Sequence, residues 1–249
     1  MESSKTIDTP IATSTHLDMD EPGSPVNETM YRGIIGSLLY FTASRPDIVF
    51  SVGLCSRFQS SPKESHLKAA KRILRYLKVT QDLVFYYPTR DNFDLIGYDD
   101  ADYADYFVDR RSTSRMEHFL GSCLISWGTK KQDFVALSTA EAIYVAAASC
   151  CAQLLWIKQQ LEDFDVFYDC MPLLCDNTSA LNMAKNPVQH KRTKHINVRL
   201  HFLRDNIEKG LICMKFCKTE DQVADIFTKA LSREHFGKNR LELGLIKLN

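Results

Sequence analysis

Three aspartates follow apolar segments of the chain, and their spacing indicates metal-dependent chemistry. Asp100 lies in "IGYDDADY", Asp176 follows "MPLLC", and Asp225 lies near the start of the helical pattern in "DQVADIFTK". Ligand sites of open α/β sheets lie beyond the carboxyl ends of strands, so these side chains could converge at one sheet edge. Carboxylates suit Mg²⁺ or Mn²⁺, and two such ions can support phosphodiester hydrolysis. Acids at strand ends are also common in turns, so a structural role stays open.

A fourth acid, Glu141, begins a long helical pattern, "LSTAEAIYVAAASCCAQLLW". Ser138 and Glu141 have the spacing of a capping box. In this motif the serine side chain accepts a hydrogen bond from a backbone amide of the helix, and the glutamate side chain reaches back to the start of the helix. Side chains two positions apart on a helix point about 200° away from each other. Glu141 therefore cannot simply replace a ligand at position 143, which is Ile143 here. We expect a capping role for Glu141, with a metal-ligand role as the alternative.

The elements that must position these acids divide the chain into four parts. Residues 1–27 contain Ser, Thr, Pro and Asp but few large apolar residues, so they are predicted to be extended or disordered. Residues 28–90 carry helical patterns. Residues 91–231 contain both strand patterns and helix patterns, and residues 232–249 form a final helical pattern. The sequence thus predicts a small helical segment followed by a mixed α/β domain.

Basic residues form local clusters, although the chain has a formal net charge of zero. The segment "HKRTKHINVR" is the strongest candidate for a phosphate-contacting patch, and two shorter clusters could extend it. A solvated surface is the alternative interpretation. Phosphate contacts would give affinity without sequence specificity and a strong dependence on salt. The candidate nucleic-acid-binding residues are Arg110, Arg111, Lys130, Lys131, Lys191, Arg192, Lys194 and Arg199.

The composition narrows the setting in which the chain works. Its 249 residues are 45% hydrophobic and 25% charged, which is typical of a globular protein. No apolar run approaches the roughly 20 residues that a membrane span needs, and the N-terminus does not resemble a secretory signal. The eight cysteines form no CxxC pair, so we expect buried thiols in a reducing, intracellular compartment, either cytoplasm or nucleus.

Several motifs together resemble the end of the Pol polyprotein of plant copia-type (Ty1/copia) retrotransposons. They are "YRGIIGSLLYFTASRPDI", "ESHLKAAKRILRYLK", "GYDDADYAD", "DRRSTS", "SWGTKKQ", "VALSTAEA", "LLCDNTSA", "RTKHINVR" and "EDQVADIFTK". The resemblance implies a reverse-transcriptase thumb and connection remnant over residues 28–90. It also implies a ribonuclease H domain over residues 91–231, with a mixed five-stranded sheet flanked by helices.

The same resemblance implies a partner, a reaction and a site. Ribonuclease H hydrolyses the RNA strand of an RNA–DNA hybrid, using two Mg²⁺ (or Mn²⁺) ions held by Asp, Glu, Asp and Asp. Asp100, Asp176 and Asp225 match three of these positions. The polymerase's own catalytic acids are absent from the chain, so no DNA synthesis is expected. The remainder of a Pol polyprotein is a further expected partner if the chain is a fragment, and no membrane is expected.

Departures from the family pattern predict that the nuclease is weakened or lost. Ile143 stands where the family usually has the second glutamate. Asp99 replaces a serine and is expected to compete with Asp100 for the metal, while Asp105 and Arg115 replace glycines. If those glycines had positive φ, each replacement would strain a turn. Three hypotheses follow: a working hybrid nuclease, a nucleic-acid-binding remnant without catalysis, or a transposon relic with no selected function.

Overall fold

The computed structural model describes residues 7–89, 92–103, 110–185 and 197–247, without the side chains of residues 197–200. The chain divides into two compact units. Residues 1–86 and 229–249 form the first, and residues 87–228 form the second. The predicted domain covers residues 91–231, whereas the second unit covers residues 87–228 and the C-terminal segment groups with the helical unit.

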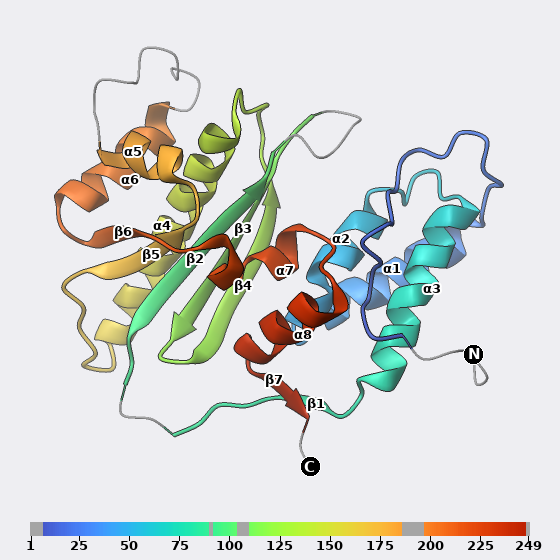
Figure 1. Cartoon of the computed structure of the whole chain (residues 1–249), viewed down its shortest axis with the longest axis horizontal. Coiled ribbons are helices and arrows are strands. Elements are labelled where there is room, and N and C mark those ends of the chain that lie inside the picture. Colours follow the sequence, from blue (N-terminus) through green and yellow to red (C-terminus); the bar gives the residue numbers. More distant parts are fainter. Residues whose placement is uncertain (1–6, 90–91, 104–109, 186–196, 248–249) are drawn as a thin grey trace. The chain divides into compact units, whose positions relative to one another are not determined.

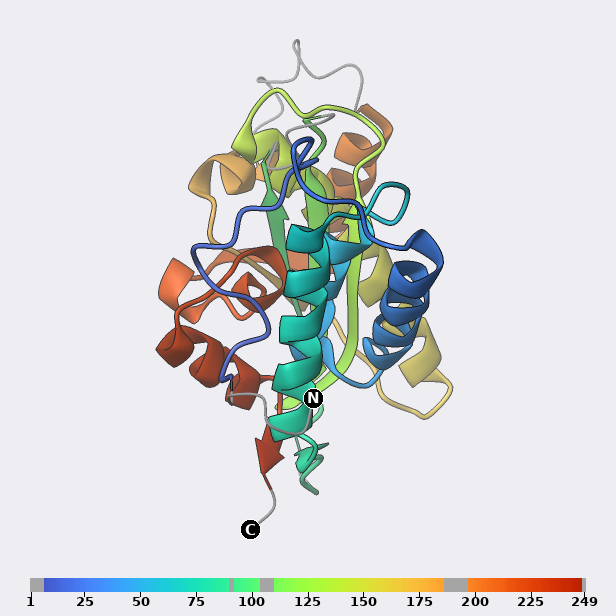
Figure 2. The ribbon, with the colours of Figure 1, turned by 90° about the vertical axis from the view of Figure 1, so that its right-hand side faces the viewer.

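The first unit consists of helices and a two-stranded antiparallel sheet. Its described elements are α1 (Glu28–Phe41), η1 (Pro46–Ile48), α2 (Val49–Ser56), α3 (Glu64–Val79), β1 (Leu83–Phe85), α8 (Arg233–Glu242) and β7 (Leu245–Lys247). β1 pairs with β7. Residues 7–27 contain no helix but lie along α3, as Figure 2 shows. The Nε2 atom of His66 lies 2.7 Å from the Asp18 carbonyl, and Arg72 Nε donates to the Thr9 carbonyl at 3.1 Å.

A buried ion pair connects the helices of this first unit. Arg45 donates from Nε and Nη2 to the two carboxylate oxygens of Asp47, at 2.9 and 2.7 Å. The Tyr76 hydroxyl on α3 donates to the same carboxylate at 2.5 Å. Asp47 is 1% exposed. Because each partner satisfies the other within the core, this network fixes the segment before α2 against α3.

The second unit contains the five-stranded mixed sheet, and this part of the prediction is confirmed. Its strands are β2 (Leu95–Asp102), β3 (Thr113–Leu120), β4 (Cys123–Lys131), β5 (Met171–Cys175) and β6 (Ile212–Phe216), in the order β4-β3-β2-β5-β6. β2, β3 and β4 pair antiparallel, and β5 pairs parallel with both β2 and β6. Gly121 has φ +60° and forms the turn between β3 and β4, where only a residue without a Cβ is free of strain.

Helices flank this sheet, as Figure 1 shows. They are α4 (Thr139–Glu162), α5 (Thr178–Lys185), α6 (Asn197–Glu208), the short η4 (Thr219–Asp221) and α7 (Asp225–Thr228). α4 packs on β2 at Gly97, where an added Cβ would lie 2.8 Å from the Cys150 sulfur and 2.9 Å from Leu154 Cδ1. This glycine allows the central helix to approach the central strand closely.

α4 is also long and apolar enough to cross a membrane, by length and composition alone, which corrects the expectation that no segment qualifies. However, 67% of its most apolar stretch is buried inside the unit. The core helix of a globular domain has the same composition, because it is apolar on most sides.

One pair of cysteines corrects the prediction of thiols throughout. Cys170 and Cys213 form a disulfide with a Cα–Cα distance of 6.0 Å, and they lie 43 residues apart in the sequence. Cys170 directly precedes β5 and Cys213 lies on β6, so the pairing of these strands brings the two residues together. The other six cysteines are free.

Candidate active site

The three predicted aspartates lie around one edge of the sheet. β2 and β5 are parallel neighbours, so their carboxyl ends meet at the same edge. Asp100 lies near the end of β2, Asp176 directly follows β5, and Asp225 begins α7, which packs against β2 and β3. Asp100 and Asp225 are 9% and 8% exposed.

Two of these carboxylates accept hydrogen bonds from the chain itself. The backbone amide of Ala101 donates to Asp100 Oδ1 at 2.7 Å. The hydroxyl of Thr219 on η4 donates to Asp176 Oδ2 at 3.1 Å. The side chains are therefore held by local contacts, and a metal ion would be an additional partner.

Asp99 and Asp100 lie on opposite faces of the sheet. Successive side chains of a strand alternate between faces, and Gly97 faces α4, so Asp99 faces α4 as well. Asp99 is fully buried, and neither carboxylate oxygen has a hydrogen-bond partner in the part of the chain that the structure describes. Burial raises its pKa well above the usual value, and the nearby charges of Asp100 and Asp176 raise it further. Because Asp99 faces α4 and not the side of Asp100, and because its raised pKa favours the neutral form, it is not the expected competitor for a metal beside Asp100.

Glu117 is an acid of this site that sequence reasoning missed. It lies on β3 opposite Tyr98, and Arg115 lies opposite Asp100, so Glu117 and Asp100 are diagonal neighbours on one face. Glu117 is fully buried, and both of its carboxylate oxygens have no hydrogen-bond partner among the described residues. Burial raises its pKa most, followed by the charge of Asp100, while Arg115 lowers it. The sequence signal was an acid inside an otherwise apolar strand pattern, "MEHFLG".

Arg115 adds a buried cation to the face that carries Asp100. Its Nη2 atom donates to Asp102 Oδ2 at 2.8 Å, and its side chain is 3% exposed. Arg115 lies within β3 and is not among the described residues with positive φ, which corrects the strain expected from replacing a glycine there. Asp105, the other such replacement, lies outside the described residues.

Glu141 has the capping contacts that the sequence predicts. Its backbone amide donates to the Ser138 hydroxyl at 3.2 Å, and its Oε2 accepts from the Leu137 amide at 2.5 Å. The carboxylate thus reaches back past Ser138, one residue further than in a standard capping box. Ile143 is 4% exposed and belongs to the hydrophobic core.

The side chains as placed do not fit a pair of divalent ions. Within the described residues, no group of three or more His, Cys, Asp or Glu side chains is arranged to hold a metal ion. Ile143 offers no oxygen, Glu141 contacts the start of its own helix, and Arg115 places a positive charge beside the acids. The catalytic and metal roles of Asp100, Asp176 and Asp225, and the alternative ligand role of Glu141, stay predictions.

The predicted basic residues are only partly described. Arg110, Arg111, Lys130 and Lys131 are exposed. Arg110 has φ +55°. Lys130 and Lys131 end β4, where Lys130 lies opposite Ser114 and Lys131 opposite Thr113 of β3. Arg199 lies on α6, and its side chain is among those that the structure does not describe. The others, Lys191, Arg192 and Lys194, lie outside the described residues.

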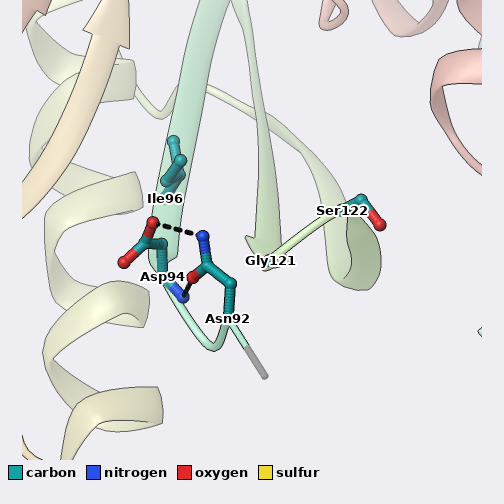
Figure 3. Close-up of a pocket in the computed structure, with 5 residues that line it drawn as sticks. All are labelled: Asn92, Asp94, Ile96, Gly121 and Ser122. Atoms are coloured by element: carbon teal, nitrogen blue, oxygen red, sulfur yellow. Dashed lines mark hydrogen bonds between the residues drawn. The ribbon is translucent and has the colours of Figure 1, made fainter. Parts of the chain in front are cut away.

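A small pocket lies at the other end of β2 and is separate from the acids (Figure 3). Asn92, Asp94, Ile96, Gly121 and Ser122 line it. The Asn92 side-chain amide donates to Asp94 Oδ2 at 2.8 Å, and the Gly121 amide donates to the Asp94 carbonyl at 2.8 Å. These contacts belong to the turn itself, so the pocket adds nothing to the candidate active site.

Several of the curated sequences related to this chain are transposon polyproteins. The chain is 36% identical over 249 residues to the retrovirus-related Pol polyprotein from transposon RE2 of Arabidopsis thaliana, covering 100% of this chain and 17% of that protein. It is 34% identical over 245 residues to the corresponding polyprotein from transposon TNT 1-94 of Nicotiana tabacum, covering 95% of this chain and 18% of that protein. The chain thus spans less than a fifth of these relatives. No protein-family model matches it.

Two solved structures are similar to part of the chain. Ribonuclease H1 of Halobacterium salinarum has 12% identity and a TM-score of 0.35, covering 53% of this chain and 90% of that one. The N-terminal ribonuclease H domain of Rv2228c from Mycobacterium tuberculosis has 9% identity and a TM-score of 0.40, covering 60% of this chain and 98% of that one.

Proposed function

Since the chain belongs to the Pol polyproteins of plant copia-type transposons, we propose that its second unit is a ribonuclease H-like domain that binds RNA–DNA hybrid but cleaves it weakly or not at all. The observation that carries the proposal is the 36% identity to a Pol polyprotein over the whole chain, combined with a candidate site that lacks one acid. Asp100 and Asp176 lie at the carboxyl ends of the parallel neighbours β2 and β5, and Asp225 begins α7, which packs on β2 and β3. Ile143 offers no oxygen. The remainder of a Pol polyprotein is the proposed protein partner, and the first unit is its reverse-transcriptase remnant.

Exposed cations support the binding part of the proposal. Arg110, Arg111, Lys130 and Lys131 lie on the unit that also carries the acids, and they are all exposed. Contacts of such side chains with phosphates are independent of sequence and weaken steeply as salt rises. We therefore expect salt-dependent binding to hybrid, with little preference between sequences.

The weakness of catalysis follows from how phosphoryl transfer depends on position. Positioning and charge stabilisation supply most of the rate enhancement, so a missing ligand lowers the rate by orders of magnitude. Mg²⁺ and Mn²⁺ are the proposed cofactors of an intact site. Here the donor set does not fit them, because Ile143 replaces one donor and Arg115 brings a competing charge.

A cleavage assay on labelled RNA–DNA hybrid tests the chemical part of this proposal. The full chain, Ile143→Glu and Asp100→Asn are compared in Mg²⁺ and in Mn²⁺. We expect almost no cleavage by the unmodified chain and higher activity for Ile143→Glu, provided that this variant still folds in spite of a carboxylate in the core. Robust cleavage by the unmodified chain that Asp100→Asn abolishes would refute the proposed loss of catalysis.

Binding is tested separately by gel shift on hybrid and on duplex DNA over a range of salt concentrations. The double variant Lys130→Gln/Lys131→Gln should bind hybrid more weakly and show a shallower salt dependence than the unmodified chain. Lys215→Gln, which removes an exposed cation from β6, is the matched control. A folded chain that binds neither nucleic acid would favour the remaining hypothesis of a relic without selected function; a cooperative thermal melt establishes that it is folded.

A further inference from the structure

The cation at the candidate active site belongs to the chain itself. Arg115 is the cross-strand partner of Asp100 on β2, and its guanidinium donates to Asp102 at 2.8 Å. Residues 100 and 102 share one face of β2, because side chains alternate along a strand. The guanidinium is 3% exposed, and the Asp102 side chain is 17% exposed. This ion pair is therefore shielded from solvent.

Glu117 provides a second, independent observation on the same face. It lies two residues beyond Arg115 on β3, is fully buried, and has no hydrogen-bond partner for either carboxylate oxygen among the described residues. The charge of Arg115 lowers the pKa of Glu117, whereas the charges of Asp100, Asp99 and Asp225 raise it. The guanidinium thus lies within the electrostatic reach of a whole group of acids.

We propose that Arg115 is the resident counter-ion of the face formed by Asp100, Asp102 and Glu117, and that it takes the place of a divalent cation there. This inference deepens the proposed function, because it assigns the poor fit for metal ions to a specific side chain. A guanidinium holds its charge under all ordinary conditions and forms directional bonds with carboxylates. A divalent ion at Asp100 would meet a fixed positive charge on the neighbouring strand, and like charges repel strongly in a poorly solvated site.

The proposal predicts how folding stability responds to divalent ions. An ion that binds only the folded state raises the melting temperature, and the rise grows with the logarithm of the ratio of its concentration to its dissociation constant. At matched ionic strength, the full chain should melt at the same temperature with and without about 10 mM MgCl₂. This concentration is roughly 100 times the dissociation constant of a 0.1 mM site, so the shift that such a site causes would be detected. Arg115→Gln should melt lower in the absence of divalent ions, because acids that Arg115 neutralised are left uncompensated, and MgCl₂ or MnCl₂ should restore part of the loss.

Two matched variants separate charge from shape in this experiment. Arg115→Lys keeps the charge and should remain insensitive to MgCl₂. Lys215→Gln removes an exposed charge from β6 of the same unit and should also remain insensitive. An Arg115→Gln variant that folds but responds to MgCl₂ no more than the unmodified chain would overturn the proposal.

Direct metal binding keeps the proposal testable if Arg115→Gln does not fold. Titration of the unmodified chain with Mn²⁺, followed by electron paramagnetic resonance, should show a dissociation constant above about 10 mM, roughly 100 times that of a 0.1 mM site. Sub-millimolar binding that Asp100→Asn abolishes would overturn the resident counter-ion. Neither experiment contains nucleic acid, so its failure leaves hybrid binding unaffected, and a failed gel shift leaves the counter-ion result unaffected.

Discussion

Replacing His118 by leucine should remove a specific acid sensitivity of the second unit. His118 is fully buried on the α4 side of β3, and its Nε2 lies 3.4 Å from both the carbonyl oxygen and the sulfur of Cys150. Burial lowers the pKa of its imidazole from 6.5 to about 4, although hydrogen bonds to the backbone of Cys150 and Ser126 partly oppose this. The folded state therefore holds a neutral ring at pH values where the unfolded chain is already protonated.

The magnitude follows from the difference between the two pKa values. The stability associated with neutral His118 is fully present above pH 6.5 and is lost as the pH falls towards 4, because the unfolded state binds the additional proton. The difference between 6.5 and about 4 corresponds to about 3 kcal/mol when the loss is complete. His118→Leu lacks this term, so its stability relative to the unmodified chain should rise by most of that amount between pH 7 and pH 4.

Urea unfolding followed by circular dichroism at several pH values measures this difference. His201→Leu, which removes an exposed histidine from α6, is the matched control. Asp99 and Cys150 also face this region, and both have raised pKa values. The stability associated with neutral Asp99 is therefore lost as the pH rises, which is the opposite direction to that of His118. Asp99 and Cys150 are present in each chain, so the comparison removes most of their effect. Parallel stability profiles for His118→Leu and the unmodified chain would refute the reasoning.

Three further substitutions test contacts of the two units, each by thermal or urea unfolding. Asp47→Ala should cost about 3–5 kcal/mol, because it leaves a mostly buried arginine without its carboxylate; a loss below 1 kcal/mol would contradict this. Gly97→Ala should cost about 1–3 kcal/mol by overpacking against α4, whereas Gly128→Ala, whose Cβ meets nothing closer than 3.8 Å, should not. Cys213→Ser should cost about 4 kcal/mol under oxidising conditions and nothing in reductant, as expected for a 43-residue separation; equal losses in both would contradict a disulfide role.

Local patterns predicted those features that depend on neighbours in sequence. The apolar segment that carries Asp100 forms β2, and the long helical pattern begun by Glu141 spans Thr139–Glu162. The capping contacts of Glu141 were predictable for the same reason, since Ser138 lies only three residues away. Such features require only the backbone period and a short-range hydrogen bond.

Features that depend on strand pairing were not predictable in this way. The disulfide requires β5 and β6 to be neighbours, and the expectation of thiols failed because the two cysteines lie 43 residues apart. Glu117 was missed because its relation to Asp100 exists only in the antiparallel register of β2 and β3. The strain expected from replacing a glycine at Arg115 is absent because this residue lies inside a strand, which its sequence position alone does not reveal.

The ionisable residues of the two central strands suggest how this edge of the sheet remains folded without a divalent ion. Carboxyl groups close together in a poorly solvated region repel one another unless a cation or protons neutralise them. Here the cation is Arg115, paired with Asp102, and burial raises the pKa values of both Glu117 and Asp99 so that each favours its neutral form. Under the proposed counter-ion role, the charge of Arg115 and the raised pKa values together reduce the repulsion between these acids. Restoring an acid at position 143 alone would leave Arg115 in place, so Ile143→Glu combined with Arg115→Gly should recover more hybrid cleavage than either change alone.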